Sequence, residues 1–586
     1  MRPDLDTVVG LLQRAAAVPD AGIRVLDRAE RESRRSWRDI RERASGIAGG
    51  LQALGVAPGE TVALVFPTGF AFLEALFGVL TAGAVPVPLY PPARLGRLDE
   101  YQRLTAALLV AARARIVLVD PRVRRILGPA MLEARPPLGC RDLESLPRAA
   151  SLRPAIGAED LALVQFSSGT TVDPKPVALS HRALVTQARL LNGLWPDRPG
   201  VAHSGVSWLP LYHDMGLIGC VLPALERPAP LTLLAPEDFV ARPASWLRAL
   251  SRYGATVSAA PNFAYALCTR KVRDEEMEGV DLSRWEIAIN GAETVVPEVV
   301  RAFASRFARW GFHEQAITPV YGLSESALAV TFSEPSRPFR SCRFDRAALA
   351  SGHAVPDSRG VEIVALGRPL RGFELAVGDE RGGTLEEGRV GRVRVRGPSL
   401  MRGYLHRPEA TAEAIRDGWL ETGDLGFVRE GELYLVGRDK DILIVNGRNH
   451  APDPFERSVA GVRGARPGCA VAVAFHPESA ETEEVLLLIE AAAGASDEER
   501  AALPERCAER ALAATGVRPS AVVVLEPGTL PRTSSGKLRR QEALRRFLEG
   551  RLDPPRRVTR RLIAGALARS SLAYLRGRLG GERRDG

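Results

Sequence analysis

Short apolar runs recur along the chain, and helical or loop segments separate them. The run at residues 61–66 is followed by an apolar stretch with helical spacing and then by the run 85–89. A strand, a helix and a second strand at this spacing form a βαβ unit, which implies a parallel sheet. Further runs of the same kind lie at residues 116–119, 161–166, 206–209, 231–234, 255–259, 285–289 and 317–320. The sequence therefore predicts an α/β fold with mainly parallel sheets.

Polar clusters follow five of these runs directly. They read SSGTT, PLYHDMG, PNFAY, NGAE and YGLSES. Ligands of open α/β sheets bind at the carboxyl ends of the strands. A single polar cluster after a strand would be an ordinary loop. Five clusters at the same end of their strands instead predict a binding site at one edge of the sheet.

The stretch 164–181, VQFSSGTTVDPKPVALSH, carries the first of these clusters. Its hydroxyls, its glycine and its nearby cation suit a polyphosphate, which binds to hydroxyls and free backbone N–H groups. The residues concerned are Ser167, Ser168, Gly169, Thr170, Thr171 and Lys175. Taken alone, a solvated turn is the better interpretation, because Pro174 stands where a P-loop has its second glycine.

The length of 586 residues predicts more than one domain. From about Arg368, alternating runs punctuated by glycine predict an antiparallel subdomain. After a charged break at residues 437–440, three apolar runs and a helix around residues 497–514 predict a small α+β domain. We expect a large domain over 1–437, a hinge at 438–440, a small domain over 441–550 and a basic tail over 551–586.

Charge and cysteine usage restrict the function classes. The formal net charge is +9, but residues 551–586 hold ten arginines and three acids, so this tail carries +7 and the rest of the chain +2. A body that is nearly neutral argues against a nucleic-acid groove. The six cysteines are far apart, which favours free thiols in a reducing cytoplasm. We expect no signal peptide, because two aspartates fall within the first six residues, and no transmembrane segment, because Pro67, Pro86 and Pro88 interrupt the most apolar stretch.

The tail itself has two interpretations. Its arginines, with apolar residues at helical spacing, suit peripheral contact with an anionic membrane surface or with an acidic partner such as a carrier protein. A solvated helix packed on the small domain is at least as consistent with the pattern.

Several strings together resemble one enzyme family. They read SWLPLYHDMGLIG, RPASWLRALSRYGATVSAAPNFAYALC, NGAETV, YGLSES, GWLETGDLG, GRDKDILIVNGRNH and LPRTSSGKLRR. In this order they resemble the adenylate-forming superfamily over roughly residues 36–548, and the forms YHDMG, APNFAY and GRNH resemble its fatty acyl-AMP ligases.

The resemblance implies an enzyme that uses ATP and Mg²⁺ to convert a fatty acid to acyl-AMP and then passes the acyl group to an acyl carrier protein. It implies Lys537 as the catalytic lysine and His213 at the junction of the ATP and acyl sites. It implies Glu325 as the Mg²⁺ ligand and Lys440 as the hinge residue between two poses of the small domain. The implied ATP-binding residues are Ser168, Gly169, Thr170, Thr171 and Lys175 for the phosphates, Gly291, Ala292 and Tyr321 for the adenine, and Asp424 and Arg438 for the ribose, with Glu293, Gly322 and Ser324 as further cofactor-binding residues.

Some of these residues have simpler interpretations. By itself His213 could be a packed core residue, Glu325 a charge at a helix N-terminus, and Lys537 a solvated cation. Val172 and Pro176 stand where the family often has glycine, and either would be costly at a position that needs positive φ.

Three functions therefore remain open: a fatty acyl-AMP ligase, a fatty acyl-CoA ligase, and a non-catalytic homologue with an altered phosphate loop. The stretch 333–368 has little periodicity, and we assign it to the extra segment that fatty acyl-AMP ligases carry. The alternative is a mobile loop that has no influence on the acceptor.

Overall fold

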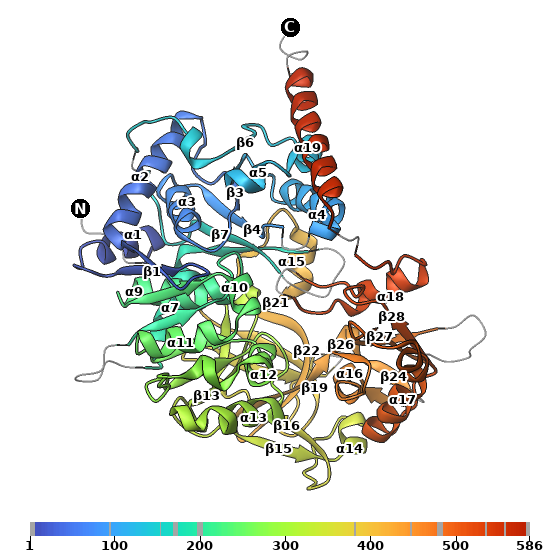
Figure 1. Cartoon of the computed structure of the whole chain (residues 1–586). Helices are drawn as coiled ribbons and strands as arrows, with labels where there is room; N and C mark the ends of the chain where they lie inside the picture. Colours follow the sequence, from blue (N-terminus) through green and yellow to red (C-terminus); the bar gives the residue numbers. More distant parts are fainter. Residues whose placement is uncertain are drawn as a thin grey trace.

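The computed structural model describes residues 6–92, 95–152, 154–167, 174–195, 203–379, 382–445, 448–476, 484–533, 536–555 and 558–581. It has a large α/β part and a smaller C-terminal domain beside it (Figure 1). The predicted fold class is confirmed, with parallel sheets, an antiparallel region and a small α+β domain.

A nine-stranded sheet forms the centre of the large domain, in the order β17-β14-β13-β12-β11-β9-β10-β1-β2. Its strands are β1 (Gly22–Leu26), β2 (Glu32–Ser36), β9 (Gly205–Ser207), β10 (Leu231–Leu234), β11 (Val257–Ala260), β12 (Ile287–Asn290), β13 (Ile317–Gly322), β14 (Ala329–Phe332) and β17 (Arg368–Pro369). Strands β9, β11, β12 and β13 are parallel neighbours, so four of the five polar clusters meet at one sheet edge, as predicted.

Helices cover this sheet (Figure 1). They include α1 (Val8–Ala15), α7 (His181–Asn192), α9 (Leu222–Glu226), α10 (Pro236–Ala241), α11 (Ala244–Arg252), α12 (Asn262–Lys271) and α13 (Pro297–Phe307). Aromatic side chains fill the space beneath them, with Trp246 in edge contact with both Tyr265 and Trp285. This packing fixes the strand ends that carry the polar clusters.

A second, four-stranded parallel sheet has the order β4-β3-β5-β6. It consists of β3 (Thr61–Val65), β4 (Val85–Leu89), β5 (Ile116–Val119) and β6 (Cys140–Arg141), with α2 (Trp37–Ala53), α3 (Phe70–Thr81), α4 (Leu98–Ala111), α5 (Pro121–Arg124) and α6 (Gly128–Ala134) around it. Strands β3 and β4 pair in parallel, which confirms the predicted βαβ unit.

The run 161–166 forms a strand, β7 (Leu161–Phe166), but not in either parallel sheet. It pairs antiparallel with β8 (Pro176–Ser180), and β8 pairs with β20 (Gly403–Tyr404). The linker between β7 and β8 is too short for the crossover that parallel strands need. The strand that precedes the fifth polar cluster therefore belongs to a separate three-stranded sheet, a correction to the single edge predicted.

Beyond these sheets the chain is antiparallel, as predicted, with β18 (Glu374–Gly378), β19 (Gly391–Arg396), β21 (Ile415–Arg416), β22 (Trp419–Arg429) and β23 (Glu432–Arg438) in one sheet. The stretch 333–368 is not a loop without structure. It forms a hairpin of β15 (Ser341–Phe344) and β16 (Val361–Val364) with α14 (Arg346–Ala350) between them. The ring of Phe344 lies 5.0 Å from that of Phe427, and this contact anchors the hairpin to the antiparallel sheet.

The small domain contains a three-stranded sheet, β26 (Ala465–Phe475), β27 (Glu484–Ala491) and β28 (Ala521–Leu525). Its other elements are the hairpin β24 (Leu443–Val445) and β25 (Arg448–His450), and helices α16 (Pro452–Ser458), α17 (Asp497–Thr515) and α18 (Arg540–Leu548). Helix α17 begins at a capping box of Ser496 and Glu499 and ends at Gly516 in the left-handed conformation, which agrees with the predicted helix.

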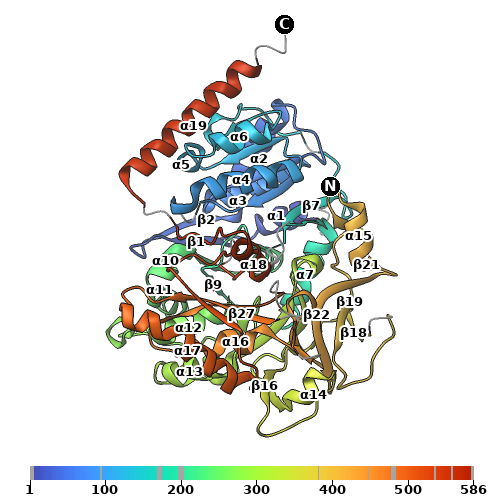
Figure 2. The ribbon, with the colours of Figure 1, turned by 90° about the vertical axis from the view of Figure 1, so that its right-hand side faces the viewer.

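The tail forms α19 (Arg560–Gly581), which packs on α6 of the large domain. The Ser570 hydroxyl accepts a hydrogen bond of 2.8 Å from the Gly128 N–H, and the Tyr574 hydroxyl donates one of 3.0 Å to the Arg124 carbonyl. The expectation that a helical tail would pack on the small domain is wrong. Figure 2 shows α19 along the outer side of α6, well away from α17.

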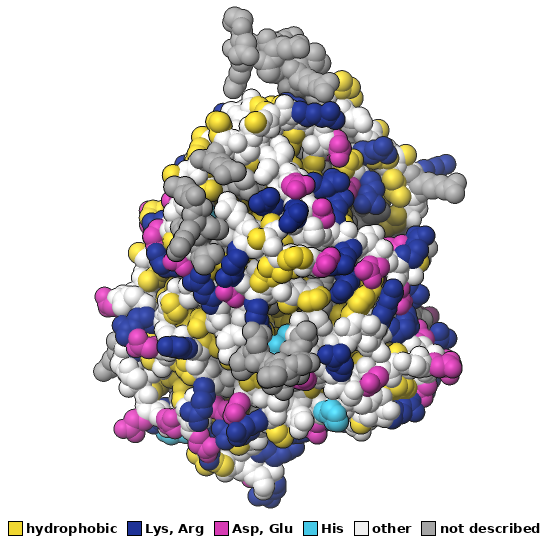
Figure 3. Space-filling view, turned by 90° about the vertical axis from the view of Figure 1, so that its left-hand side faces the viewer, with side chains coloured by type: hydrophobic (Ala, Val, Ile, Leu, Met, Phe, Trp, Pro, Cys, Tyr) yellow, Lys and Arg dark blue, Asp and Glu magenta, His cyan; other side chains and the backbone are white. Residues whose placement is uncertain are grey.

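No described helix is long and apolar enough to cross a membrane. Acidic and basic side chains lie interspersed over the face of the molecule in Figure 3.

Candidate active site

A cavity of about 3690 Å³ lies where the large and small domains meet. Residues from the ends of β9, β11, β12 and β13 line it, together with residues of β22, β23 and the small domain. It therefore brings together parts of the chain that are separated by more than 300 residues, such as His213 and Lys537.

Asp424 and Arg438 stand opposite each other on the paired strands β22 and β23. The Arg438 Nε donates to Asp424 Oδ1 over 3.0 Å, and the Tyr321 hydroxyl donates to Asp424 Oδ2 over 2.7 Å. The Asp424 carboxylate raises the pKa of Arg438, which keeps the guanidinium charged. A carboxylate fixed from both sides beside an open cavity is suited to accept hydrogen bonds from a ligand's hydroxyls.

The backbone after β12 makes a narrow slot. A side chain at Gly291 would place its Cβ 2.6 Å from the Val320 side chain, so only glycine fits there. Ala292 follows in the left-handed region with φ 69°, a conformation that side chains rarely adopt. Gly322 is equally constrained, because a Cβ would lie 1.8 Å from the Leu328 carbonyl oxygen. Both glycines therefore let neighbouring strands pack closely beside the cavity, which both residues line.

Glu293 lies at the end of this slot, near Lys537. Its Oε1 accepts a hydrogen bond from the Phe263 N–H, and burial raises its pKa. Glu293 also lines the cavity, and its carboxylate is near enough to Lys537 to affect the pKa of that lysine.

Lys537 lies in the cavity among charged groups of both signs. Burial lowers its pKa, and the carboxylates of Asp214, Glu293 and Asp424 oppose this shift. The Lys537 N–H bonds to the Thr533 hydroxyl over 3.0 Å, and Arg532 donates to the Gly536 carbonyl over 2.7 Å. Lys537 therefore lines the cavity, and it is not the solvated cation that its position among arginines suggested.

His213 contacts Asp214, a residue that the sequence analysis did not select. Its Nδ1 lies 2.6 Å from Asp214 Oδ1, and Asp214 Oδ2 accepts a hydrogen bond from the Ser324 hydroxyl. Burial would raise the pKa of Asp214, but His213 and Ser324 lower it well below its ordinary value. The string YHDMG contained this signal, because a carboxylate next to the histidine can fix its ring.

Glu325 follows β13 in a short 3₁₀ turn and is mostly buried, with its pKa raised by that burial. The Tyr404 hydroxyl donates to Glu325 Oε1 over 3.0 Å, and the Lys175 ammonium lies 4.7 Å from the centre of the Tyr404 ring. Two predicted phosphate and metal residues, Lys175 and Glu325, are thus joined by one tyrosine. Among the described residues, no three His, Cys, Asp or Glu side chains form a metal site.

The phosphate-loop residues Ser168, Gly169, Thr170 and Thr171 lie outside the described residues, and so does Val172. Pro176 is described, and it begins β8 opposite Phe166. Its carbonyl accepts from the Leu405 N–H over 2.8 Å in an extended pairing, and it is not among the residues with positive φ. The concern that proline would strain the loop at residue 176 is therefore wrong.

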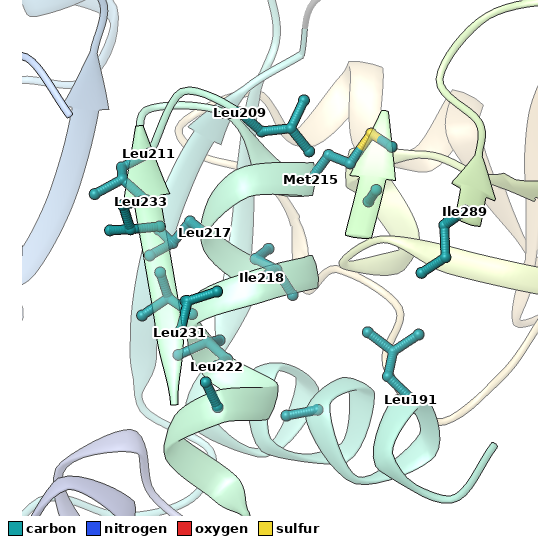
Figure 4. Close-up of a cluster of buried hydrophobic side chains, with 14 of the residues drawn as sticks. Leu191, Leu209, Leu211, Met215, Leu217, Ile218, Leu222, Leu231, Leu233 and Ile289 are labelled. Atoms are coloured by element: carbon teal, nitrogen blue, oxygen red, sulfur yellow. The ribbon is translucent and has the colours of Figure 1, made fainter. Parts of the chain in front are cut away.

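Apolar side chains line the part of the cavity next to His213. Leu191, Leu209, Met215 and Ile289 belong both to this wall and to the buried cluster in Figure 4. Trp208, Phe263, Leu328 and Phe332 extend it. A wall of this kind can hold a hydrocarbon chain.

The small domain is held against the large domain by polar contacts. The Thr294 hydroxyl donates to Asp453 Oδ2 over 2.6 Å, and Arg97 donates to the carbonyls of Gly528 and Thr529 at 3.1 and 3.0 Å. Lys440 lies exposed in the 3₁₀ turn η8 (Asp439–Asp441) between the domains. The Lys440 carbonyl accepts from Gln541 over 3.0 Å.

Arg540 is a second residue that sequence analysis passed over. It pairs with Glu456 at 2.7 Å, with Asp441 at 3.0 Å and with Asp453. Burial disfavours its charge, but the three carboxylates more than compensate and raise the pKa of Arg540. Because Asp441 adjoins the predicted hinge and Asp453 contacts Thr294, Arg540 connects the lysine loop to the domain interface.

A family model described as AMP-binding enzyme matches residues 12–405. The chain belongs to this family of AMP-binding enzymes. It is an adenylate-forming ligase, as its sequence motifs predicted, and such enzymes draw the adenylate from ATP.

Relatives of this adenylate-forming ligase agree with the assignment. A Mycobacterium marinum protein named long-chain-fatty-acid–AMP ligase FadD26 is 34% identical over 87% of this chain and 91% of its own length. A Caulobacter vibrioides protein named as an acyl-CoA synthetase is 35% identical over 91% of this chain and 94% of its own. A solved structure from work on fatty acyl-adenylate ligases of E. coli and L. pneumophila has 32% identity and a TM-score of 0.87, covering 94% of this chain and 99% of that one.

Proposed function

We propose that this ligase activates a long-chain fatty acid as its acyl-adenylate and then transfers the acyl group to the phosphopantetheine thiol of an acyl carrier protein. In the first step a carboxylate oxygen of the acid bonds to the α-phosphorus of ATP, and the bond to the β-phosphate breaks to release pyrophosphate. In the second step the thiol sulfur replaces AMP at the acyl carbonyl carbon, and the thiol proton goes to solvent.

One observation carries the proposal: the side chain of Lys537 enters the cavity between a polar slot and an apolar wall. The polar side has Asp424 and Arg438 for ribose hydroxyls, and Gly291 and Ala292 for a flat base. The apolar side suits a fatty chain. Negative charge accumulates where the two anionic reactants meet, and a fixed cation there favours the transition state.

His213 has a positioning function in this proposal. Its contact with Asp214 holds the imidazole at the boundary of the polar and apolar parts. The Ser324 hydroxyl holds the same carboxylate from the other side, so the boundary stays fixed while the acid binds.

The donor set around Glu325 fits Mg²⁺. This hard cation takes one carboxylate and completes its shell with phosphate oxygens and water, so a single buried carboxylate is sufficient. Glu325, whose pKa is raised by burial in the absence of a cation, would hold the ion, and Lys175 would face the phosphates beside it. When bound, Mg²⁺ neutralises phosphate charge and polarises the phosphoryl oxygens.

The Tyr404 hydroxyl orients the Glu325 carboxylate, so Tyr404→Phe should weaken the apparent Mg²⁺ affinity about tenfold, at the low end for loss of a partner behind a metal ligand. The phenyl ring keeps the contact with Lys175. The measurement is the rate of acyl-AMP formation against Mg²⁺ concentration at fixed ATP. Tyr434→Phe, which loses only a hydroxyl near Cys342, is the matched control. Equal Mg²⁺ dependence in the two variants would contradict the role of Glu325.

The identity of the acid is tested by incubating the enzyme with MgATP and fatty acids of increasing length. We expect acyl-AMP by mass spectrometry for long-chain acids. Absence of every acyl-AMP, with ATP binding retained, would favour a non-catalytic homologue.

The acceptor depends on how the small domain moves after adenylation. We propose that it turns about Lys440, so that Lys537 leaves the cavity and the thiol enters. The hairpin within residues 333–368 bears on this motion, because α14 lies against β25 of the small domain. An ordered segment in that place restricts the rotation and the approach of a free nucleotide thiol.

With free CoA we therefore expect acyl-AMP to accumulate, and with a phosphopantetheinylated carrier protein we expect it to be consumed. The same carrier without its phosphopantetheine is the control, because it offers the same surface but no thiol. Rapid conversion of CoA to acyl-CoA would instead assign this chain to the acyl-CoA ligases.

A further inference from the structure

We propose that helix α19 and the adjacent α5 form a docking surface for an anionic lipid bilayer, so that the enzyme lies on a membrane surface. The inference concerns the tail and does not rest on the proposed reaction.

The inner face of α19 is fixed on the large domain. Ala566, Ser570 and Ala573 are buried against it, and a Cβ at Gly128 would lie 2.2 Å from the Ser570 carbonyl oxygen. Small residues therefore permit the two helix backbones to approach closely. Because the inner face is held by packing, the outer face keeps a defined orientation.

The outer face exposes large apolar side chains. The structure describes 13 exposed large hydrophobic residues, and two of them, Leu572 and Leu575, lie on the side of α19 opposite its buried residues, with Val558 and Ile563 exposed on the same short segment. Leu572 is 50% exposed and Leu575 is 56% exposed. Scattered exposed leucines are normal, but a cluster on one short segment indicates a surface that is covered by something else.

Arginines lie among these apolar residues. Arg561, Arg569 and Arg576 are exposed on α19, and residues 560–581 contain five arginines and no acid. Arg569 has a nearby partner in Asp99 at 3.3 Å, and that contact is at the exposed surface. Leucines that enter the acyl boundary and arginines that reach the phosphates are the pattern of a helix lying in a membrane interface.

A crevice beside the helix adds positive charge. It has a volume of about 530 Å³ and is lined by Pro121, Arg124, Arg125, Asp142, Leu567, Ser571 and Tyr574. Arg124 pairs with Asp142 at 2.8 Å, while Arg125 lies exposed at the edge. The crevice therefore offers an anionic headgroup both a cation and an apolar wall.

A bilayer fits this surface better than an acidic carrier protein does. The carrier must deliver its thiol to the reaction cavity, but no described residue before Ser167 or after Arg540 lines that cavity. Charge alone would be enough for a carrier, and exposed leucines would not be needed. Helix α19 does not have enough apolar residues to span a membrane. It would therefore lie along the membrane surface.

The test is co-sedimentation of the full-length protein, without ATP or fatty acid, with vesicles of phosphatidylcholine alone or mixed with phosphatidylglycerol. We expect binding to the anionic vesicles that weakens with salt, and at least tenfold weaker binding to neutral ones. The double variants Leu572→Ser/Leu575→Ser and Arg561→Gln/Arg576→Gln should each bind anionic vesicles at least tenfold more weakly.

Leu152→Ser is the matched control, because Leu152 is 73% exposed in another part of the large domain, and it should bind as the wild type does. All variants should keep the wild-type melting temperature, which separates loss of binding from loss of folding. Equal binding to neutral and anionic vesicles, no binding to either, or wild-type binding by the leucine variant would each overturn the proposal. Loss of carrier-protein binding in the arginine variant, without any vesicle binding, would assign the surface to that protein.

Discussion

Replacing Lys537 with alanine should lower the rate of acyl-AMP formation by roughly 10²- to 10³-fold, the range for loss of one group directed at developing charge. In the cavity Lys537 faces Asp214, Glu293 and Asp424, and the small domain brings its charge into the site. The measurement is single-turnover formation of acyl-AMP from MgATP and a long-chain acid. We expect a fall in kcat with little change in KM for ATP, because the ribose residues Asp424 and Arg438 are untouched.

Transfer from added acyl-AMP to the carrier thiol should survive in the same variant, since that step needs Lys537 outside the cavity. Arg103→Ala is the control, because Arg103 is an exposed cation on α4 that does not line the cavity, and its rates should stay at the wild-type level. A Lys537 variant that keeps more than half of the wild-type adenylation rate would remove this residue from the mechanism.

Replacing Arg540 with methionine should lower the free energy of unfolding of the small domain by about 3–5 kcal/mol, the range for a buried ion pair that loses one partner. The Arg540 side chain is 18% exposed and holds Asp441, which is 1% exposed, together with Asp453 and Glu456. Methionine keeps the volume of the stem but leaves three carboxylates facing one another. Hydrogen exchange of β26 and α18 reports this local stability directly.

The loss should depend on pH. In the wild type Arg540 helps to hold the pKa of Asp453 below its ordinary value of 3.8 despite burial, so this group contributes stability above that value and loses it as the pH falls through the folded pKa. In the variant, burial and mutual repulsion raise the pKa of the carboxyl groups. Their contribution to the free energy of unfolding is therefore present below about pH 4 and is lost as the pH rises. The difference between the two proteins should therefore be small at pH 4 and full at pH 7.

Arg518→Met serves as the comparison, since Arg518 pairs with Glu505 at the surface of the same domain and both are about half exposed. Its effect should stay below about 1 kcal/mol at every pH. Similar decreases in the free energy of unfolding in the two variants would show that the buried Arg540 cluster stabilises the small domain no more than a surface ion pair does.

Local patterns predicted the regular parts of this enzyme well. The run 116–119 is β5, the helix expected around residues 497–514 is α17, and the polar clusters after β9, β11, β12 and β13 share one edge. These features depend on hydrophobic periodicity and on turn residues, and both are visible within a short segment of sequence. Strand β2, with the sequence ESRRS, gave no such signal, because an edge strand with exposed side chains needs no apolar alternation.

The sequence by itself determined the fold class, the family and the residues that bear the chemistry, because strand periodicity and chemically demanding motifs are written in short segments. Only the tertiary structure decided that Ser324 binds Asp214, that Arg540 gathers three carboxylates, that residues 333–368 form a hairpin against the small domain, and that α19 returns to α6. Each of these depends on groups distant in sequence, whose meeting is set by packing and by the burial of charge. A one-dimensional pattern does not specify which distant surfaces meet.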